Sequence, residues 1–314
     1  MRDVMTREVL LSAFISPPQI VDEQDNRLLV RGNIEASPDS YIQVSWDRYF
    51  TDLSQGSFRD YVGPGENERV WRSRAWHFVF KNANFVGRLF ARPEARILDL
   101  GCSSGFLRRM IEGNASPADR HKFFYWGVDV REENLKRALR SPDDLEWGGD
   151  GTFMPSLFMQ QDLKFPLPFK SGFFDLVVNF EMIKYLPIDQ GAALLAESRR
   201  VVKDDGALYL STTDYAELKH QGLENFMRSL SPDQVAKMVE DAGFNVVERF
   251  GSQVRFAKLA KLLNEDQRRL ANALLRVHPP ELVAAILGPL FPQHADQVTF
   301  QATPKVAKSD QKGA

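Results

Sequence analysis

The stretch Arg96-Ile97-Leu98-Asp99-Leu100-Gly101-Cys102-Ser103-Ser104-Gly105-Phe106-Leu107 decides the fold of this chain. Its apolar first part ends in a loop of small residues, and the residues from Phe106 onward have helical spacing. An apolar, β-branched run bounded by glycine predicts a buried strand. Small loop residues let the backbone amides at a helix start approach a ligand closely. The stretch therefore predicts a strand–turn–helix unit of an α/β sheet, in which ligands bind beyond the strand ends.

The spacing of the glycines separates two classes of nucleotide site. A dinucleotide fingerprint reads G-x-G-x-x-G, whereas this loop reads G-x-x-x-G from Gly101 to Gly105. Asp99 would repel a diphosphate but suits a ligand that carries an ammonium group. The arrangement resembles motif I of the class I S-adenosylmethionine-dependent methyltransferases, D/E-x-G-x-G-x-G, with Ser103 in place of the middle glycine. An ordinary glycine-rich turn and a nicotinamide-dependent dehydrogenase are the alternatives.

A second acid supports the resemblance. The buried run from Phe123 to Val130 predicts a strand that ends at Asp129, and acids in the following turn favour a helix start. A carboxylate at this position can accept hydrogen bonds from both hydroxyls of a ribose. We therefore expect Asp129, with Val130 beside it, to bind the sugar of a cofactor. Capping of the helix is the alternative role for Asp129.

The resemblance extends to the third and fourth strands. It implies that Asp162, after a strand at 157–160, binds the adenine amine and that Leu163 packs on the ring. The block 165–186 looks like small-molecule methyltransferases related to the ubiquinone and menaquinone biosynthesis enzymes, which implies that Asn179 and Phe180 line the methionine end of the cofactor. The expected cofactor residues are Asp99, Gly101, Cys102, Ser103, Gly105, Asp129, Val130, Asp162, Leu163, Asn179 and Phe180.

The residues that handle the acceptor are less apparent in the sequence. Tyr185 stands where many relatives have a histidine, so the usual imidazole base is missing. We expect Tyr185, Glu181, Asp214 and His220 to be candidates for substrate or proton handling. The five histidines are scattered without ligand spacing, and no metal site is predicted.

The resemblance implies an α/β fold with a Rossmann-like, mostly parallel sheet of seven strands, the last one antiparallel at the edge. The fifth strand, 207–213, would follow a turn in which Gly206 needs a positive φ. We expect an N-terminal addition at 1–65 that contains a hairpin. A small core packed on the main domain is the favoured interpretation of this addition, and a lid or substrate wall is the alternative. The methyltransferase domain would comprise 66–253 and 297–302, interrupted at 254–296 by two helices, the first spanning 255–277, and followed by a tail at 303–314.

Composition and charge indicate in which compartment the protein works and which partners are disfavoured. A hydrophobic content of 43% and a charged content of 26% are typical of a soluble globular protein. The net charge of −2 argues against nucleic acid as a partner. Cys102 is the single cysteine, which fits a reducing compartment, and no run reaches membrane-spanning length. We expect a cytoplasmic protein without a leader peptide.

The expected activity is methyl transfer from S-adenosylmethionine to an oxygen or nitrogen of a small molecule such as a sugar, a natural product or a quinone-like metabolite. Two alternatives stay open. The departure at Tyr185 and the large additions would also suit a non-catalytic, cofactor-binding partner subunit. The basic, amphipathic helix after residue 254 would suit an RNA or protein methyltransferase, although core packing or formation of a homodimer is the favoured explanation of this helix.

Overall fold

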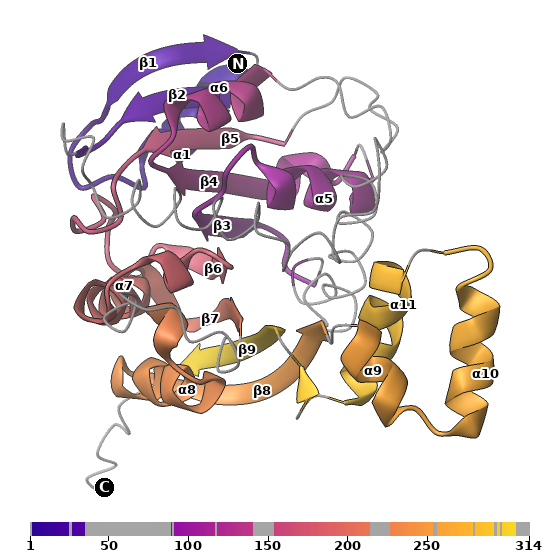
Figure 1. The fold of residues 1–314 in the computed structure, drawn as a ribbon. Coiled ribbons are helices and arrows are strands. Elements are labelled where there is room, and N and C mark those ends of the chain that lie inside the picture. Colours follow the sequence, from indigo (N-terminus) through magenta and orange to yellow (C-terminus); the bar gives the residue numbers. More distant parts are fainter. Residues whose placement is uncertain are drawn as a thin grey trace, which may run out of the picture.

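The structure is a computed structural model in which a mixed sheet carries helices on both faces (Figure 1). It describes residues 2–24, 27–34, 89, 91–116, 118–140, 154–213, 227–253, 256–278, 280–291, 294–295 and 297–305. Within these ranges, no helix combines the length and apolar character needed to cross a bilayer. Residues 35–65 of the expected N-terminal addition lie outside the described residues.

The described residues form a nine-stranded sheet in the order β1-β2-β5-β4-β3-β6-β7-β9-β8. The six strands from β2 to β7 in this order pair in parallel, β1 is antiparallel to β2, and β9 is antiparallel to both β7 and β8. The strands are β1 (Gln19–Gln24), β2 (Arg27–Arg31), β3 (Ala95–Leu100), β4 (Phe123–Asp129), β5 (Ser156–Gln160), β6 (Phe174–Phe180), β7 (Val202–Thr213), β8 (Phe244–Gln253) and β9 (Gln297–Pro304).

The expected fold class is confirmed, with two differences in the sheet. The hairpin predicted near the N-terminus exists as β1 and β2, but β2 pairs with β5 and so extends the sheet beyond seven strands. The expectation that the last strand lies at the edge is wrong, because β9 is inserted between β7 and β8. β8 therefore occupies the edge opposite β1 (Figure 1).

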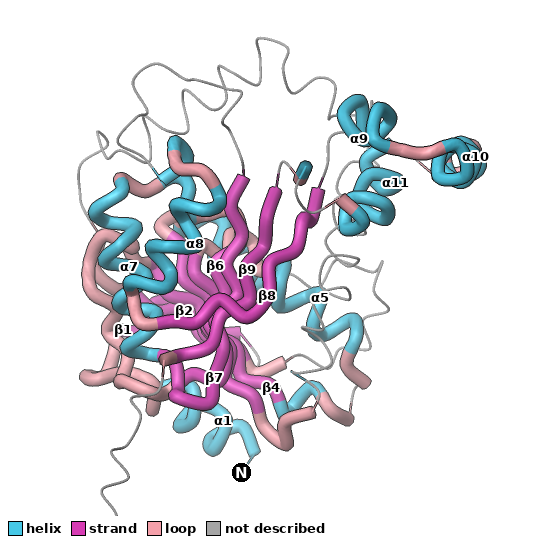
Figure 2. Tube along the Cα trace, turned by 90° about the horizontal axis from the view of Figure 1, so that it is seen from below, coloured by secondary structure: helices cyan, strands magenta, loops and turns pink. Residues whose placement is uncertain are grey.

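Among the described residues, two hydrophobic clusters hold helices on the sheet. α1 (Arg2–Leu11), α7 (Ile188–Val201) and α8 (Pro232–Asp241) contribute to one cluster, and α5 (Phe106–Asn114) and α6 (Glu132–Arg140) contribute to the other. Figure 2 shows α7 and α8 on one side of the strands and α5 on the other. Short 3-10 helices are η1 (Arg120–Lys122), η3 (Ile183–Tyr185), η4 (Met227–Ser229) and η5 (Gly288–Leu290).

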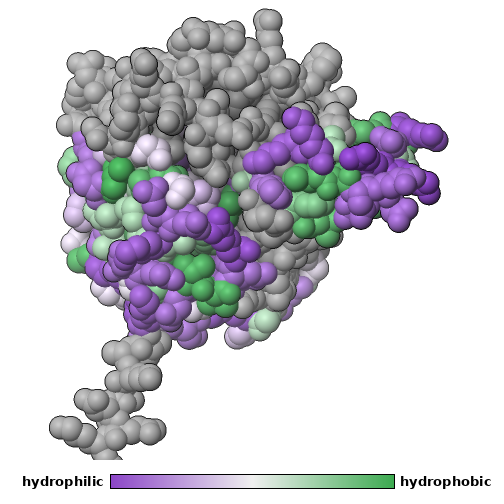
Figure 3. Space-filling view, turned by 60° about the horizontal axis from the view of Figure 1, so that its bottom comes forward, coloured by the Kyte–Doolittle hydropathy of each residue, from purple (hydrophilic) through white to green (hydrophobic). Residues whose placement is uncertain are grey.

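The described part of the helical insertion contains three α-helices rather than the two expected. α9 (Phe256–Leu262) ends before α10 (Glu265–Leu274), and α11 (Pro280–Leu287) follows. The predicted helix at 255–277 is interrupted because Asn264 caps α10, accepting the N–H of Gln267, whose side chain bonds back to Asn264. These helices project to one side of the sheet (Figure 2), and α10, at the far end of this projection, is mainly hydrophilic on its surface (Figure 3).

Gly206 lies within β7, and its role differs from the prediction. It does not have the positive φ expected of a turn glycine. A Cβ atom at this position would instead lie 2.7 Å from a methyl carbon of Val202 and 2.9 Å from the carbonyl oxygen of Asp175. Close approach of two neighbouring strands, not left-handed backbone, therefore requires glycine here.

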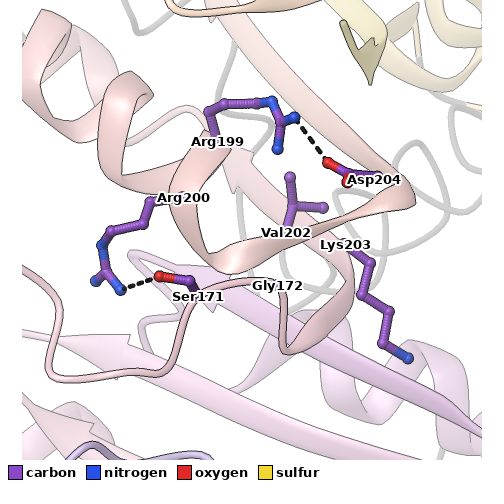
Figure 4. Close-up of a pocket in the computed structure, with 7 residues that line it drawn as sticks. All are labelled: Ser171, Gly172, Arg199, Arg200, Val202, Lys203 and Asp204. Carbon is purple, nitrogen blue, oxygen red and sulfur yellow. Dashed lines mark hydrogen bonds and ion pairs between the residues drawn. The ribbon is translucent and has the colours of Figure 1, made fainter. Parts of the chain in front are cut away.

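A hollow of about 490 Å³ lies near the amino ends of β6 and β7 (Figure 4). Its lining residues are Ser171, Gly172, Arg199, Arg200, Val202, Lys203 and Asp204. The three cations already have anionic partners: Arg199 binds Asp204, Arg200 binds Glu197 and Lys203 binds Asp175. This hollow is therefore a structural feature, remote from the carboxyl edge at which ligands of parallel sheets bind.

Candidate functional site

The loop between β3 and α5 has an unusual backbone. Gly101, Ser103 and Gly105 have φ values of 84°, 49° and 76°. The N–H groups of Gly101 and Cys102 donate to the carbonyl oxygen of Val128 at 2.8 and 3.0 Å, which holds the loop against β4. Left-handed backbone costs a non-glycine residue free energy. The conformation of Ser103 therefore explains why the related motif has glycine at this position.

Asp129 is tied directly to this loop. Its Oδ2 accepts the N–H of Ser103 and its Oδ1 accepts the N–H of Arg131, each at 2.9 Å. Burial raises the pKa of this carboxyl group, and the bonds from the amides of Arg131 and Ser103 oppose that effect. Each carboxylate oxygen has a further lone pair. Asp129 can therefore anchor the loop and still accept hydrogen bonds from a ligand.

Asp99, by contrast, is nearly enclosed by the protein. Its side chain is 5% exposed, and its Oδ2 accepts the hydroxyl of Tyr125 at 2.6 Å. Burial raises the pKa of Asp99 to about 7, the Tyr125 bond opposes the rise, and the charge of Asp129 adds to it. Asp99 is therefore poised between its protonated and ionised forms at neutral pH.

Cys102 belongs to the loop, and its side chain fills space next to Gly127. It is 3% exposed, and burial raises the pKa of its thiol well above the usual value, so the thiol stays neutral. Val130, next to Asp129, is half-buried, and its carbonyl oxygen accepts a hydrogen bond from the side chain of Gln160 at 3.2 Å. Both residues thus contribute to the carboxyl edge of β3 and β4.

The carboxyl end of β5 is covered by the segment after β2. The N–H of Asp162 donates to the carbonyl oxygen of Asn33, and the N–H of Asn33 donates to Gln161 Oε1. Asp162 is 1% exposed and accepts the N–H of Lys164 at 3.1 Å, and Leu163 belongs to the hydrophobic cluster at 8% exposure. Burial raises the pKa of Asp162. Binding of adenine by these two residues stays a prediction.

A charged cluster lies at the carboxyl end of β6. Glu181 has a positive φ of 60°, its Oε1 accepts the hydroxyl of Ser211 at 3.0 Å, and its N–H donates to the same hydroxyl oxygen at 2.9 Å. The ammonium group of Lys184 lies 2.5 Å from Glu181 Oε2. The side chains of Lys184 and Glu181 are 8% and 21% exposed. A strained, partly accessible carboxylate at this position is typical of a functional site.

Asn179 and Tyr185 frame this cluster. Asn179 is 2% exposed, and its Oδ1 accepts the N–H of Ile183, which fixes the short helix η3. Tyr185 ends η3, is half-buried, and has its ring centroid 5.3 Å from the ammonium of Lys184. Phe180 is half-buried against the second hydrophobic cluster. Asp214 and His220, the other acceptor candidates, lie outside the described residues.

The loop after β3 and the segment after β6, which both contribute to the candidate site, are in contact. A Cβ atom at Gly101 would lie 2.3 Å from Cγ of Met182, so the loop after β3 packs directly on the segment after β6. Sequence reasoning missed Tyr125, Lys184 and Ser211. The opposite charges of Glu181 and Lys184, three residues apart, were a readable signal for an ion pair. Within the described ranges, no cluster of three potential metal ligands was found.

Comparisons with known proteins identify the family of this chain. The sequence model of a family described as a methyltransferase domain matches residues 72–249. An uncharacterised protein of Haemophilus influenzae is 27% identical over 136 residues, which cover 41% of this chain and 52% of that protein. The chain thus spans about half the length of this relative. The ubiquinone biosynthesis O-methyltransferase of Burkholderia pseudomallei is 25% identical over 54% of this chain and 72% of that enzyme.

A solved structure shows a similar fold. It is the complex of the Trm112 methyltransferase activator of Haloferax volcanii with a methyltransferase, and the match has a TM-score of 0.50 and 17% identity. The match covers 86% of this chain and all of the matched chain. The family match itself spans more than half of the 314 residues. The chain therefore belongs to this methyltransferase-domain family, whose cofactor is S-adenosylmethionine.

Proposed function

We propose that the protein transfers a methyl group from S-adenosylmethionine to an acidic hydroxyl group, such as a ring hydroxyl, of a small molecule. The residues around the loop suit this cofactor. Asp129 has lone pairs for the ribose hydroxyls beyond those that anchor Ser103 and Arg131. Asp99 offers a carboxyl group to the amino group of the methionine end. The bound cofactor supplies an electrophilic methyl group, already activated by the positive charge on sulfur.

The observation that carries the acceptor proposal is the bonding of Glu181. Lys184 and Ser211 together stabilise the carboxylate form, and 21% of the side chain remains exposed. A hydroxyl acceptor must lose its proton on methylation, and a positioned carboxylate can accept it. An ionised, salt-bridged carboxylate is a weak base, which favours a phenol-like hydroxyl over an aliphatic one. Glu181 would thus orient the acceptor and take up its proton.

The similarity to a ubiquinone biosynthesis O-methyltransferase supports the same acceptor class, because that enzyme is named for methylation at oxygen. The remaining candidates are methylation at nitrogen, an RNA or protein acceptor and a non-catalytic partner subunit. The neighbour bound to the Trm112 activator shows a shared fold at 17% identity and does not favour a macromolecular acceptor.

The test is a methyl-transfer assay with radiolabelled S-adenosylmethionine against matched acceptors that carry a ring hydroxyl, a ring amine or an aliphatic hydroxyl. We expect product with ring hydroxyls and a loss of about 100-fold in kcat for Glu181→Gln, the lower range for a general base. Transfer to amines at rates that Glu181→Gln leaves unchanged would contradict the proposal. Salt-sensitive retention of RNA would instead favour the macromolecular alternative.

A further inference from the structure

The side chains of Asp99, Tyr125 and Asp129 share one face of the sheet, next to the loop between β3 and α5. In the β3–β4 register, Asp99 pairs with Gly127, and Tyr125 and Asp129 lie two residues to either side of Gly127. Residues two apart on a strand point to the same face. Asp99 therefore lies between the hydroxyl of Tyr125 and the carboxylate of Asp129, and it bonds the hydroxyl at 2.6 Å.

Gly127 makes this arrangement possible. A Cβ atom on Gly127 would lie 2.7 Å from Sγ of Cys102 and 2.9 Å from a ring carbon of Tyr125. The ring and the thiol thus occupy the space that a side chain at position 127 would fill. The Tyr125 side chain is fully buried. Its hydroxyl is therefore held against Asp99 by packing on several sides.

The groups that face Asp99 bias its ionisation in opposite directions. Burial and the charge of Asp129 favour the protonated form, and the hydroxyl of Tyr125 favours the carboxylate. The pKa of Tyr125 is raised well above its usual value, mainly by burial, although the charge of Arg108 on α5 opposes this. The thiol of Cys102 is neutral. Tyr125 thus remains a hydrogen-bond donor over the physiological pH range.

We propose that Tyr125 is a positioning residue that couples cofactor binding to the release of a proton from Asp99. An ammonium group of the cofactor beside Asp99 favours the carboxylate, so binding expels the proton that the empty site holds part of the time. The bond from Tyr125 lowers the cost of that ionisation and orients the carboxylate. This inference rests on the proposed placement of the cofactor's amino group at Asp99.

Isothermal titration of the full chain with S-adenosylhomocysteine at pH 7, in buffers of different ionisation enthalpy, tests the proposal. Asp99 has a pKa of about 7, so the wild type is expected to release about half a proton per molecule bound. Tyr125→Phe removes a bond that stabilises the carboxylate. We expect about fivefold weaker binding at pH 7, the effect of a rise in the pKa of Asp99 by about one unit, and recovery by pH 9.

Two further variants separate this role from simple packing. Asp99→Asn should bind without releasing a proton at any pH. Tyr209→Phe removes the hydroxyl of another buried tyrosine of the same hydrophobic cluster, on β7, and should leave the pH dependence unchanged. Equal weakening by Tyr125→Phe at every pH, or binding to the wild type without proton release, would overturn the inference. Failure of the wild type to bind S-adenosylhomocysteine at any pH would instead refute the proposed function.

Discussion

The ammonium of Lys184 lies 2.5 Å from Oε2 of Glu181, and the two side chains are bound across one turn at the carboxyl end of β6. The pair is largely shielded from solvent, so screening weakens it less than it weakens an exposed ion pair. Glu181 also has left-handed backbone and a bond to the fully buried Ser211. Three independent constraints thus fix one carboxylate where the acceptor is proposed to approach.

Replacement of Lys184 by methionine should lower kcat without comparable loss of cofactor affinity. Without its cation, the carboxylate of Glu181 is less well oriented, and its pKa rises because the opposite charge is gone. We expect a loss of about tenfold or more in kcat at pH 7 and a shift of the acidic limb of the pH–rate profile to higher pH. Lys237→Met, which removes an exposed partner of Asp241 on α8, is the control. Identical profiles for the two variants would contradict a role for Lys184.

Gly101→Ala should destabilise the fold and weaken cofactor binding together. The new methyl group would overlap Met182 and would also require a φ of 84° from an alanine. We expect a loss of about 2–4 kcal/mol in unfolding free energy from strain and overpacking. Gly172→Ala is a matched control, because Gly172 has a φ of 60° but open space around it. Denaturant titration should show a loss of about 1 kcal/mol in unfolding free energy for the control. Equal losses in the two variants would refute the argument that contact with Met182 destabilises Gly101→Ala.

Asp175 is expected to stabilise the fold without affecting the cofactor. It is 5% exposed and binds Arg92 at 2.5 Å, Lys203 at 2.8 Å and the N–H of Arg96 at 2.9 Å. Asp175→Asn leaves two cations without their shared anion. Since both are about one-third exposed, we expect a loss of about 2 kcal/mol in unfolding free energy. Affinity for S-adenosylhomocysteine should not change, because the cluster lies at the amino end of β6. A lower affinity for S-adenosylhomocysteine, measured under conditions in which the variant is fully folded, would contradict the purely structural role of Asp175.

The raised pKa of Asp99 predicts a pH-dependent stability. The folded protein holds the proton up to a pH of about 7, whereas the unfolded chain releases it near pH 4. The unfolded state therefore binds fewer protons in this window, and the contribution of Asp99 to stability falls as pH rises from about 4 to 7. Asp99→Asn removes this effect. The unfolding free energy of the variant minus that of the wild type should therefore increase by about 3 kcal/mol from pH 5 to pH 8. A constant difference across this range would show that Asp99 has an ordinary pKa.

Local patterns were sufficient to predict most elements of the sheet. The apolar run that ends at Asp99 and the small loop after it predict β3, the loop and α5, because strand, turn and helix are each encoded by neighbouring residues. The start of α8 is likewise set by neighbouring residues, because Ser231 caps the helix and a proline follows it. The pairing of β2 with β5 depends on residues more than 120 positions apart. No local pattern specifies such a partner, and the same holds for the insertion of β9 between β7 and β8.

The candidate site was predictable in part for the same reason. Asp129 follows a strand, and its location at the carboxyl edge could be inferred from that alone. The bond from Tyr125 to Asp99 joins two strands, and its effect on the pKa depends on burial, which the sequence does not state. The break at Asn264 was readable, since Asn264 and Gln267 have the spacing of a capping box. The break was not predicted because the apolar residues keep helical spacing across 255–277.

Isothermal titration of S-adenosylhomocysteine against wild type and Asp129→Ala tests the central claim most directly. Asp129 both anchors Ser103 and is proposed to accept the ribose hydroxyls. We expect the wild type to bind and the variant to lose about 1–3 kcal/mol, or roughly 5- to 150-fold in affinity. Asp119→Ala, which removes a surface acid bonded to Ser116 and Lys122, should bind as the wild type does. Equal affinity of wild type and Asp129→Ala would contradict the proposed cofactor site.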